Sequence, residues 1–228
     1  MDPQKAWERE YDNPNFITRG SEPQADLLRF VKWLKKGKSL DLYNARLLDV
    51  GCGTGRNSFY MADAYGVRVF ATDFSKGAIT IGKKNFSHPN IEFSVHDISK
   101  PLPMPSNSFD IVFDIMTSMS LGESQREAYL KELNRLLRPG GMVYLRTLCK
   151  EGDKNAAHLL KNNVGPEKDT YIHPTLGSVE RVFSEKDLRG LYSPFFEILF
   201  MGKHTGYQKF GNQSYKRNYW NVYLRKYE

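Results

Sequence analysis

The amino-acid sequence predicts an α/β fold in which helices cover both faces of a mostly parallel, doubly wound sheet. Short apolar segments of strand type alternate with amphipathic segments of helical period between residues 40 and 150. The first apolar segment runs directly into three glycines spaced two residues apart: Gly51, Gly53 and Gly55. The 228 residues suffice for one such domain with appendages and are too few for two. We therefore expect a single domain over residues 1–228.

The glycine turn is the stretch around which the rest of the chain is arranged. Leu47, Leu48 and Val50 predict a buried parallel strand, and a helical pattern follows the glycines over residues 57–65. Glycines let the backbone turn sharply and approach a ligand more closely than a Cβ atom allows. A strand, a glycine loop and a helix in this order present backbone N–H groups and a helix N-terminus to a ligand of nucleotide type.

Two segments precede the turn. Residues 1–20 are polar, and Trp7 and Tyr11 lie four residues apart, which predicts a short helical turn with both rings on one side. We interpret this segment as a lid because no strand depends on it, and a hydrophobic anchor is the alternative. A helix is then predicted, with Ser21 as its N-cap and its end near Gly37.

The second strand, residues 67–73, ends in a carboxylate whose sequence separation from the glycine turn is informative. Asp73 lies 22 residues beyond Gly51. In a doubly wound sheet, an acid about 20 residues after the turn can accept hydrogen bonds from both hydroxyls of a ribose. The alternative is that Asp73 caps the next helix, residues 76–85. That alternative is weakened because Ser75 already offers a cap.

Three more strands are predicted in the same alternation of strand and helix. Residues 91–98 alternate apolar with polar side chains and end in an acid next to an aliphatic residue. Residues 109–116 are almost continuously apolar, which suits the centre of a sheet. A helix at residues 125–137 is expected to stop at residues 138–141, before a fifth strand at residues 142–148.

The last third of the chain breaks this rhythm. Residues 149–183 are rich in Lys, Asn and Gly, and we interpret them as an excursion over the ligand face, with a short helix at residues 155–161. A capped helix starts at Ser184 and leads to Leu191. Two β-rich runs within residues 195–224 predict an antiparallel hairpin that closes the sheet. The sheet is thus expected to have seven strands, the last of them antiparallel.

Composition narrows the setting. Apolar residues make up 40% and charged residues 26% of the chain, and no apolar run approaches the about 18 residues that span a bilayer. The first residues lack the blocks of a signal peptide and the two cysteines are expected to be reduced, so we expect a cytoplasmic protein with no membrane contact. The histidines and cysteines show no metal-ligand spacing, so no metal is expected. Residues 201–228 hold six basic residues against one acidic residue, which marks the carboxyl end as a place for an anionic partner.

Taken together, the motifs resemble those of the class I S-adenosylmethionine-dependent methyltransferases, which have a Rossmann-like fold. The set is L-L-D-V-G-C-G-T-G at the glycine turn, A-T-D-F-S after the second strand, H-D-I after the third, F-D-I-V-F-D-I-M in the fourth and L-L-R-P-G-G-M-V-Y-L before the fifth. It spans about residues 40–150, which would form the cofactor-binding core. A dehydrogenase shares the glycine turn, but its G-x-G-x-x-G motif needs glycine at position 56, where Arg56 stands.

The resemblance implies S-adenosylmethionine as the cofactor and S-adenosylhomocysteine as the product. Gly51, Gly53 and Gly55 would let the methionine moiety lie against the loop. Asp49 would order the turn from beneath.

The same resemblance implies residues for the nucleoside half. Asp73 would hold the ribose hydroxyls and Phe74 would pack on the adenine ring. Asp97 would accept a hydrogen bond from the adenine amino group, and Ile98 would close the apolar slot around the ring. Asp114 would face the region where donor and acceptor meet and would contact the methionine part or the acceptor.

Methyl transfer from a sulfonium is an in-line displacement that needs alignment and desolvation more than acid–base catalysis. The sequence therefore need not display a catalytic residue. Tyr11, Asp114 and His173 are the candidates for orienting or deprotonating an acceptor, because each is expected near the mouth of the site. A packed tyrosine and a solvated histidine are the alternatives. Cys52 and Cys149 are expected to be small core residues.

The acceptor is the least determined part. The D-I-M-T sequence of residues 114–117 lacks the Asn/Asp-Pro-Pro-aromatic clamp of many methyltransferases that act on nucleic-acid bases. We expect a small-molecule acceptor, in a pocket roofed by residues 1–20 and 149–183. RNA or a protein is the alternative, because residues 201–228 interleave aromatic and basic side chains. A non-catalytic cofactor-binding subunit is a third interpretation, which turnover to S-adenosylhomocysteine would exclude.

Overall fold

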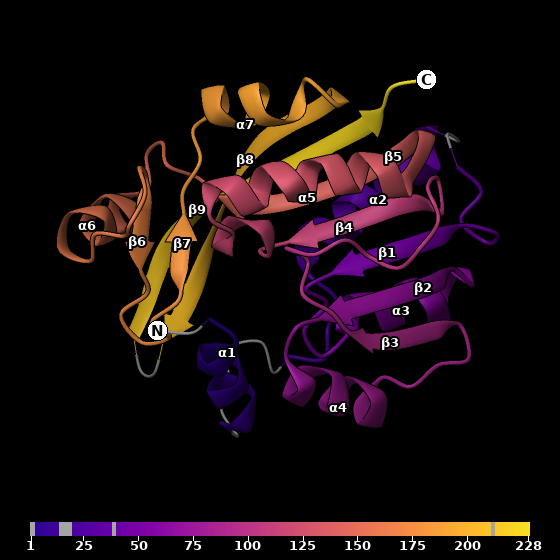
Figure 1. The fold of residues 1–228 in the computed structure, drawn as a ribbon, viewed down its shortest axis with the longest axis horizontal. Helices are drawn as coiled ribbons and strands as arrows, with labels where there is room; N and C mark the ends of the chain where they lie inside the picture. Colours follow the sequence, from indigo (N-terminus) through magenta and orange to yellow (C-terminus); the bar gives the residue numbers. More distant parts are fainter. Residues whose placement is uncertain (1–2, 14–19, 38–39, 211–212) are drawn as a thin grey trace.

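A computed structural model describes residues 3–13, 20–37, 40–210 and 213–228. Its centre is a seven-stranded sheet in the order β3-β2-β1-β4-β5-β9-β8 (Figure 1). Five strands are parallel: β1 (Arg46–Val50), β2 (Arg68–Asp73), β3 (Ile91–Val95), β4 (Phe109–Ile115) and β5 (Leu137–Leu148). The last strand in sequence, β9 (Gln213–Lys226), is antiparallel to both of its neighbours, β5 and β8 (Phe196–Phe210). The predicted Rossmann-like sheet is confirmed.

Helices cover both faces of the sheet. On one face lie α2 (Ala25–Gly37), α3 (Arg56–Tyr65) and α4 (Lys76–Asn85), whose apolar side chains share a core cluster with one set of strand residues. On the other face, α5 (Glu123–Leu136) and α7 (Glu185–Tyr192) pack against the alternate strand residues (Figure 1). Neighbouring residues of β1 point to opposite faces, so Leu47 belongs to the first cluster and Leu48 to the second. This alternation fixes the register of the central strands.

Several element ends differ from the expected ones. Helix α2 begins at Ala25, and Gln24, not Ser21, is its cap, since the Oε1 atom of Gln24 accepts from the amide of Leu27 at 2.9 Å. The amide of Gln24 is itself held by Asn57 Oδ1 at 2.9 Å, a contact from a distant helix that no local pattern reveals. Strand β3 ends at Val95, before the acid at position 97.

The expected helix end before residues 138–141 is confirmed, but the fifth strand begins earlier than predicted. Strand β5 starts at Leu137, directly after α5, and runs through this stretch. Gly140 has a φ of 70°, and the pairing of β4 with β5 shifts register here, so the glycine makes an irregularity within the strand. The proline and the two glycines therefore follow the end of α5, as predicted, but they lie within β5 and do not precede it.

Residues 149–183 contain more regular structure than expected. The predicted short helix is present as α6 (Lys154–Asn162), capped by Asp153. Outside this segment, a short 3₁₀ helix, η1 (Ser118–Ser120), lies between β4 and α5. Strands β6 (Thr170–Ile172) and β7 (Val179–Arg181) form a separate two-stranded sheet that was not predicted. At three residues each, these strands are too short for a period-two pattern to identify them.

The closing hairpin is longer than predicted. Strand β5 stops pairing where Leu148 meets Tyr219, whereas β8 and β9 remain paired from Thr205 and Asn218 onward to the hairpin end. The hairpin therefore runs past the carboxyl edge of the main sheet, beside β7 in the view of Figure 1. None of the described helices is long and apolar enough to cross a membrane.

Helix α1 (Pro3–Asp12) confirms the predicted helical turn near the amino end. It packs against α4 (Figure 1). The Trp7 and Tyr11 rings of α1 lie 6.2 Å apart between centroids. Residues 14–19 of the interpreted lid lie outside the described residues.

Candidate functional site

The glycine turn lies at the carboxyl edge of the sheet, between β1 and α3. All three glycines have positive φ: 62° at Gly51, 56° at Gly53 and 83° at Gly55. A Cβ atom on Gly51 would lie 2.2 Å from Thr117 Cγ2, and one on Gly55 would lie 2.5 Å from Phe93 Cε1. Both positions therefore need glycine for the protein's own packing as well as for backbone conformation.

Tyr11 is the side chain that α1 brings to this turn. A Cβ atom on Gly53 would lie 3.0 Å from the Tyr11 hydroxyl oxygen. The ring is 8% exposed. Of the three catalytic candidates from the sequence, Tyr11 is the one that the structure places against the glycine turn.

Asp73 ties the end of β2 to the glycine turn. Its Oδ2 atom accepts from the Gly53 amide at 2.9 Å, and its Oδ1 atom accepts from the Ser75 amide at 2.9 Å. Burial raises the pKa of Asp73 to about 6, helped by the nearby Glu8 charge, and these amide hydrogen bonds oppose the rise. Each carboxylate oxygen retains a lone pair for another donor.

Asp49 lies beneath the turn and serves it from inside. Its Oδ2 atom accepts from the Ser58 hydroxyl at 2.6 Å, which links β1 to α3. Burial raises the pKa of Asp49 to about 7, and the charges of Asp73 and Asp114 add to the rise. Because the side chain is 1% exposed, its position suits ordering of the turn.

The predicted adenine contacts lie at the neighbouring strand end. Phe74 is half-buried, and its carbonyl oxygen accepts from Gln4 Nε2 of α1 at 2.9 Å. Asp97 is exposed and caps its own turn, accepting from the Ser99 amide at 2.9 Å and from the Ser99 hydroxyl at 2.8 Å. Ile98 is half-buried and packs against the core cluster on the α5 face.

Asp114, expected to face the region where donor and acceptor meet, is buried at the end of β4. Its side chain is 1% exposed, and its Oδ1 and Oδ2 atoms accept from the Ser118 amide at 3.1 Å and from the Tyr129 hydroxyl at 2.9 Å. Burial raises its pKa, against these hydrogen bonds. These hydrogen bonds connect η1 and α5 to the end of β4.

His173 is also directed inward. It is 3% exposed, in the turn between β6 and β7, and its Nδ1 atom accepts from the amides of Thr175 at 3.3 Å and Leu176 at 3.1 Å. Burial, with Arg217 nearby, lowers the pKa of His173 to about 4. A neutral ring whose Nδ1 lone pair is engaged by two amides is unsuited to take a proton there. The solvated alternative is wrong as well, because the ring is a satisfied core group.

Helix α1 contributes a contact that the sequence did not reveal. Glu8 Oε1 accepts from the Lys76 amide at 2.8 Å, and its Oε2 atom accepts from the Gly77 amide and the Ser75 hydroxyl, both at 3.0 Å. A carboxylate on α1 thus caps the N-terminus of α4, directly after Asp73. Its partners are almost seventy residues away in sequence, so no local signal identified it.

Arg56 and Arg146 place positive charge near the glycine turn. Arg56 is the first residue of α3, and burial lowers its pKa, with Arg146 nearby as a smaller cause. Arg146 is paired with Asp26 at 3.1 Å and lies over the Tyr219 ring at 3.7 Å. In the sequence, Arg56 argued only against a dehydrogenase. Its position at the start of α3 is the signal that was missed.

The basic carboxyl end is less available than its composition indicated. Arg217 is 1% exposed and is bound by Asp153 and Tyr171 at 3.1 Å each. Lys203 lies 5.0 Å from the Trp220 ring centroid, and Lys216 is exposed. Tyr219, Trp220 and Tyr223 are core residues.

The described residues contain no cluster of three or more side chains suited to hold a metal ion. Cys52 and Cys149 are buried and free, as predicted, and burial raises the pKa of the Cys149 thiol to about 12. Neither thiol is activated as a nucleophile.

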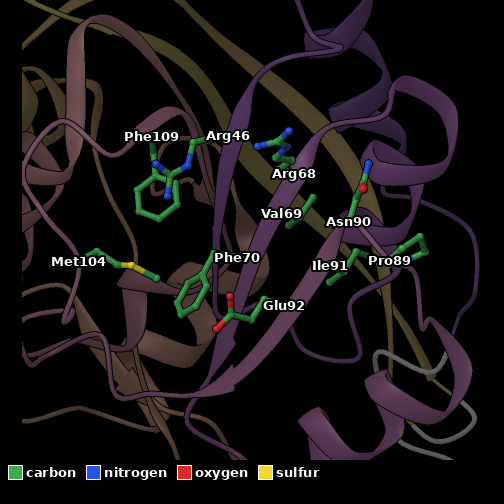
Figure 2. A pocket seen from close by; sticks show the side chains of 10 residues that line it. All are labelled: Arg46, Arg68, Val69, Phe70, Pro89, Asn90, Ile91, Glu92, Met104 and Phe109. Carbon is green, nitrogen blue, oxygen red and sulfur yellow. The ribbon is translucent and has the colours of Figure 1, made fainter.

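A cavity of about 420 Å³ lies at the opposite, amino edge of the sheet (Figure 2). Arg46, Arg68, Ile91 and Phe109, which line it, are the first residues of four neighbouring strands. The chain between β3 and β4 is an irregular loop over residues 96–108, so no helix fills this part of the α5 face. The cavity is separate from the glycine turn, which lies at the other end of the same strands.

Residues 47–141 match the family model described as methyltransferase domain. Among curated relatives, the chain is 35% identical over 109 residues to a tRNA N(3)-cytidine methyltransferase of Gallus gallus, covering 44% of this chain and 30% of that protein. It is 32% identical over 146 residues to the demethylmenaquinone methyltransferase of Renibacterium salmoninarum, covering 64% and 49%. It is 31% identical over 107 residues to phosphoethanolamine N-methyltransferase 3 of Arabidopsis thaliana, covering 46% and 21%. The chain thus spans less than half the length of each.

Solved structures resemble the chain over most of its length. A SAM-dependent methyltransferase of Methanosarcina mazei superposes with a TM-score of 0.71 at 22% identity, covering 85% of this chain and 97% of that one. A SAM-dependent methyltransferase of Anabaena variabilis gives 0.69 at 21% identity, covering 99% and 96%. At these identities the structures establish the fold. They share the Rossmann-like sheet that the class I resemblance implies, and the match to a methyltransferase domain covers residues 47–141.

Proposed function

We propose, from the premise that residues 47–141 match a methyltransferase domain, that this chain transfers a methyl group from S-adenosylmethionine to an acceptor. The observation that most supports this function is the pairing of Asp73 with the amide of Gly53. It sets a carboxylate beside a left-handed glycine turn, where two ribose hydroxyls would find acceptors. The turn also fits because a Cβ atom at Gly53 would fill the approach to its backbone.

Residues at the carboxyl edge would divide the cofactor between them. Asp73 would hold the ribose, and Phe74, Asp97 and Ile98 would border the adenine ring. Asp97 would have to share oxygens that now accept from Ser99, which each oxygen's second lone pair permits. We add Arg56, a cation at the glycine turn, for the carboxylate of the methionine part.

When bound, the cofactor supplies a sulfonium methyl group that is electrophilic without further activation. The chain's own residues would then align the acceptor and exclude water. Tyr11 is the candidate for orienting the acceptor, because its hydroxyl lies against Gly53. Asp114 and His173 are unsuited to act as bases, because their polar atoms are buried and already hydrogen-bonded.

A small-molecule acceptor is favoured over RNA. Arg217, one of the basic residues of the hairpin, is buried and donates to Asp153 and Tyr171 inside the protein. RNA remains the second candidate because the first curated relatives are tRNA methyltransferases by name. A non-catalytic cofactor-binding subunit is a third candidate. In the leading proposal, residues 1–228 act as a single domain in which α1 serves as a lid.

The test is a methyl-transfer screen with labelled cofactor. Separate reactions would contain phosphoethanolamine, demethylmenaquinone, total tRNA, and extracts of metabolites and proteins. We expect label in a small-molecule fraction and stoichiometric S-adenosylhomocysteine. Label confined to tRNA would replace the leading proposal with the second. Binding of about one equivalent of S-adenosylhomocysteine without turnover on any pool would favour the non-catalytic subunit.

Glu8→Gln is expected to speed S-adenosylhomocysteine dissociation by roughly tenfold. Its carboxylate accepts three hydrogen bonds that dock α1 on α4, and losing the charge weakens them by about 1.4 kcal/mol in total. Stopped-flow displacement would measure the rate. Asp12→Asn, exposed at the end of the same helix, is the matched control. An unchanged rate in Glu8→Gln would show that α1 does not retain the cofactor.

Replacing both Lys203 and Lys216 by alanine is expected to leave turnover of a small acceptor within about twofold of the wild-type value. Both are exposed on the β8–β9 hairpin, and a small acceptor needs no phosphate contact there. Turnover and tRNA affinity would be measured at two salt concentrations. Methylation of tRNA that this double substitution abolishes, with a steep salt dependence in the wild type, would contradict the small-molecule proposal.

A further inference from the structure

Two arginines lie close to one aromatic ring near the carboxyl ends of β4 and β5. Arg126 is the fourth residue of α5, and Arg181 is the last residue of β7. Their guanidinium carbons lie 5.4 Å and 5.2 Å from the ring centroid of Phe183. Phe183 is fixed at the end of β5, where its amide donates to the Leu148 carbonyl at 3.0 Å.

Arg126 is buried with most of its donors unused. The residue is 1% exposed, and its Nη2 atom donates to the carbonyl of Leu121. Within the described part of the chain, Nε and Nη1 of Arg126 and Nε of Arg181 have no hydrogen-bond acceptor. A guanidinium has five N–H donors and no acceptor, so these buried atoms can be satisfied only by an oxygen or another acceptor brought to them.

The carboxylates near the pair are engaged elsewhere. Glu123 and Glu167 interact electrostatically with Arg126, but both Glu167 oxygens accept from the Glu123 amide, at 2.9 Å and 3.1 Å. Asp187 interacts electrostatically with Arg181, but its Oδ2 atom accepts from the amide and the hydroxyl of Ser184. No carboxylate of the described residues pairs with either arginine within 4.0 Å. Burial lowers the pKa of Arg126, and the like charge of Arg181 adds to that effect.

Arg217 shows how the same chain treats a buried arginine that needs no ligand. It is equally buried, and its Nε and Nη2 atoms donate to Asp153 and Tyr171 at 3.1 Å. The contrast separates a built structural ion pair from a cationic site with open donors.

The arginine pair borders the expected acceptor side. Strand β7 contacts η1, which follows Thr117. The Thr117 hydroxyl donates to the Val50 carbonyl at 3.0 Å, and its Cγ2 atom occupies the space beside Gly51. One short loop therefore lies between the glycine turn and the two guanidinium groups.

We propose that Arg126 and Arg181 bind an oxyanionic group, a phosphate or a carboxylate, of the methyl acceptor. This inference rests on the proposed function. Guanidinium groups match both oxyanions because parallel N–H donors meet two oxygens at once. Phe183, close to both guanidinium groups, gives the ligand an apolar wall.

Thermal unfolding of the full chain would test the site with inorganic phosphate and, separately, acetate as probes, at constant ionic strength in chloride. We expect a saturable rise in midpoint of roughly 5 to 10 °C at a hundredfold excess over Kd with at least one anion. Arg126→Met and Arg181→Gln should each weaken that response at least tenfold. Arg189→Gln, an exposed arginine of α7, is the matched control and should keep it.

Arg126→Met also has a readout that a structural role would not give. Without anions, its midpoint should equal or exceed that of the wild type, because a buried unpaired cation is removed. A wild-type protein without a saturable response to either anion would overturn the inference, as would a full response in both variants. Titration with S-adenosylhomocysteine in the same samples separates the anion site from the proposed methyltransferase function. If S-adenosylhomocysteine binds but neither anion gives a response, only the anion site is wrong. A response to phosphate alone assigns a phosphate ester, and one to acetate alone a carboxylate.

Discussion

Asp73→Asn is expected to weaken S-adenosylhomocysteine binding by roughly 10- to 100-fold, because two charge-assisted hydrogen bonds from ribose hydroxyls lose their anionic acceptor. Asparagine keeps one carbonyl oxygen for the amides that Asp73 now serves at Gly53 and Ser75. It therefore disturbs the glycine turn less than alanine would. Isothermal titration calorimetry would measure the affinity.

The same carboxylate predicts how cofactor affinity depends on pH. Its pKa is raised to about 6, so Asp73 is mostly protonated below pH 6 and ionised above pH 7 in the free protein. Because the ribose hydroxyls need the ionised form as acceptor, affinity should rise with pH through this window, about tenfold from pH 5 to pH 7. Asp73→Asn should lose that step and keep any step that belongs to Asp49, whose pKa is about 7.

Asp97→Asn is the matched control, since Asp97 is an exposed acid at the neighbouring strand end. We expect a smaller loss of affinity and an unchanged pH profile. If Asp73→Asn bound with wild-type affinity at every pH, another carboxylate would hold the ribose, and the assignment of Asp73 would be wrong.

Arg217→Met is expected to lower the free energy of unfolding by about 3 to 5 kcal/mol, the range for breaking a buried ion pair from one side. Asp153 Oδ2 would keep only the Asn218 amide at 2.8 Å, and its charge would lie buried without a cation. Tyr171 would lose the Arg217 donor at 3.1 Å, and Glu180, whose pKa burial raises, would lose a nearby positive charge.

Urea denaturation would measure this loss. Arg189→Met removes an exposed arginine of α7 that pairs with Glu185 at 2.8 Å, and a change below about 1 kcal/mol is expected there. Equal stability of the two variants would mean that the Asp153–Arg217 pair does not hold α6 to β9. The result also bears on RNA, because an arginine that stabilises the interior cannot double as a phosphate contact.

Much of the fold was predictable because its signals are local. The caps at Ser75 and Ser184 follow from side chains that accept from amides three residues later, at 3.0 Å and 3.1 Å. The glycine turn and the apolar strands are equally local, and all five parallel strands appear in the predicted order, although β3 ends and β5 starts earlier than predicted.

The candidate site was less predictable because its decisive contacts join distant segments. Glu8 reaches α4 across almost seventy residues, and the burial of Asp114 and His173 depends on how α5 and the β6–β7 turn pack. A sequence pattern places a side chain at a strand end, but the side to which it turns is decided by neighbours from elsewhere in the chain. The same limit hid the open donors of Arg126.

The placement of β9 sets an order of events during protein synthesis. Strand β5 is completed at Leu148, yet its outer edge pairs with β9, whose Tyr219 leaves the ribosome roughly 4 to 14 s later at typical elongation rates. Until then the nascent chain presents an unpaired strand edge, a template for aggregation, and β8 has no strand beside it. Translation that stops after residue 212 would leave both strands in that state, so a premature stop there should yield a client for chaperones and proteases.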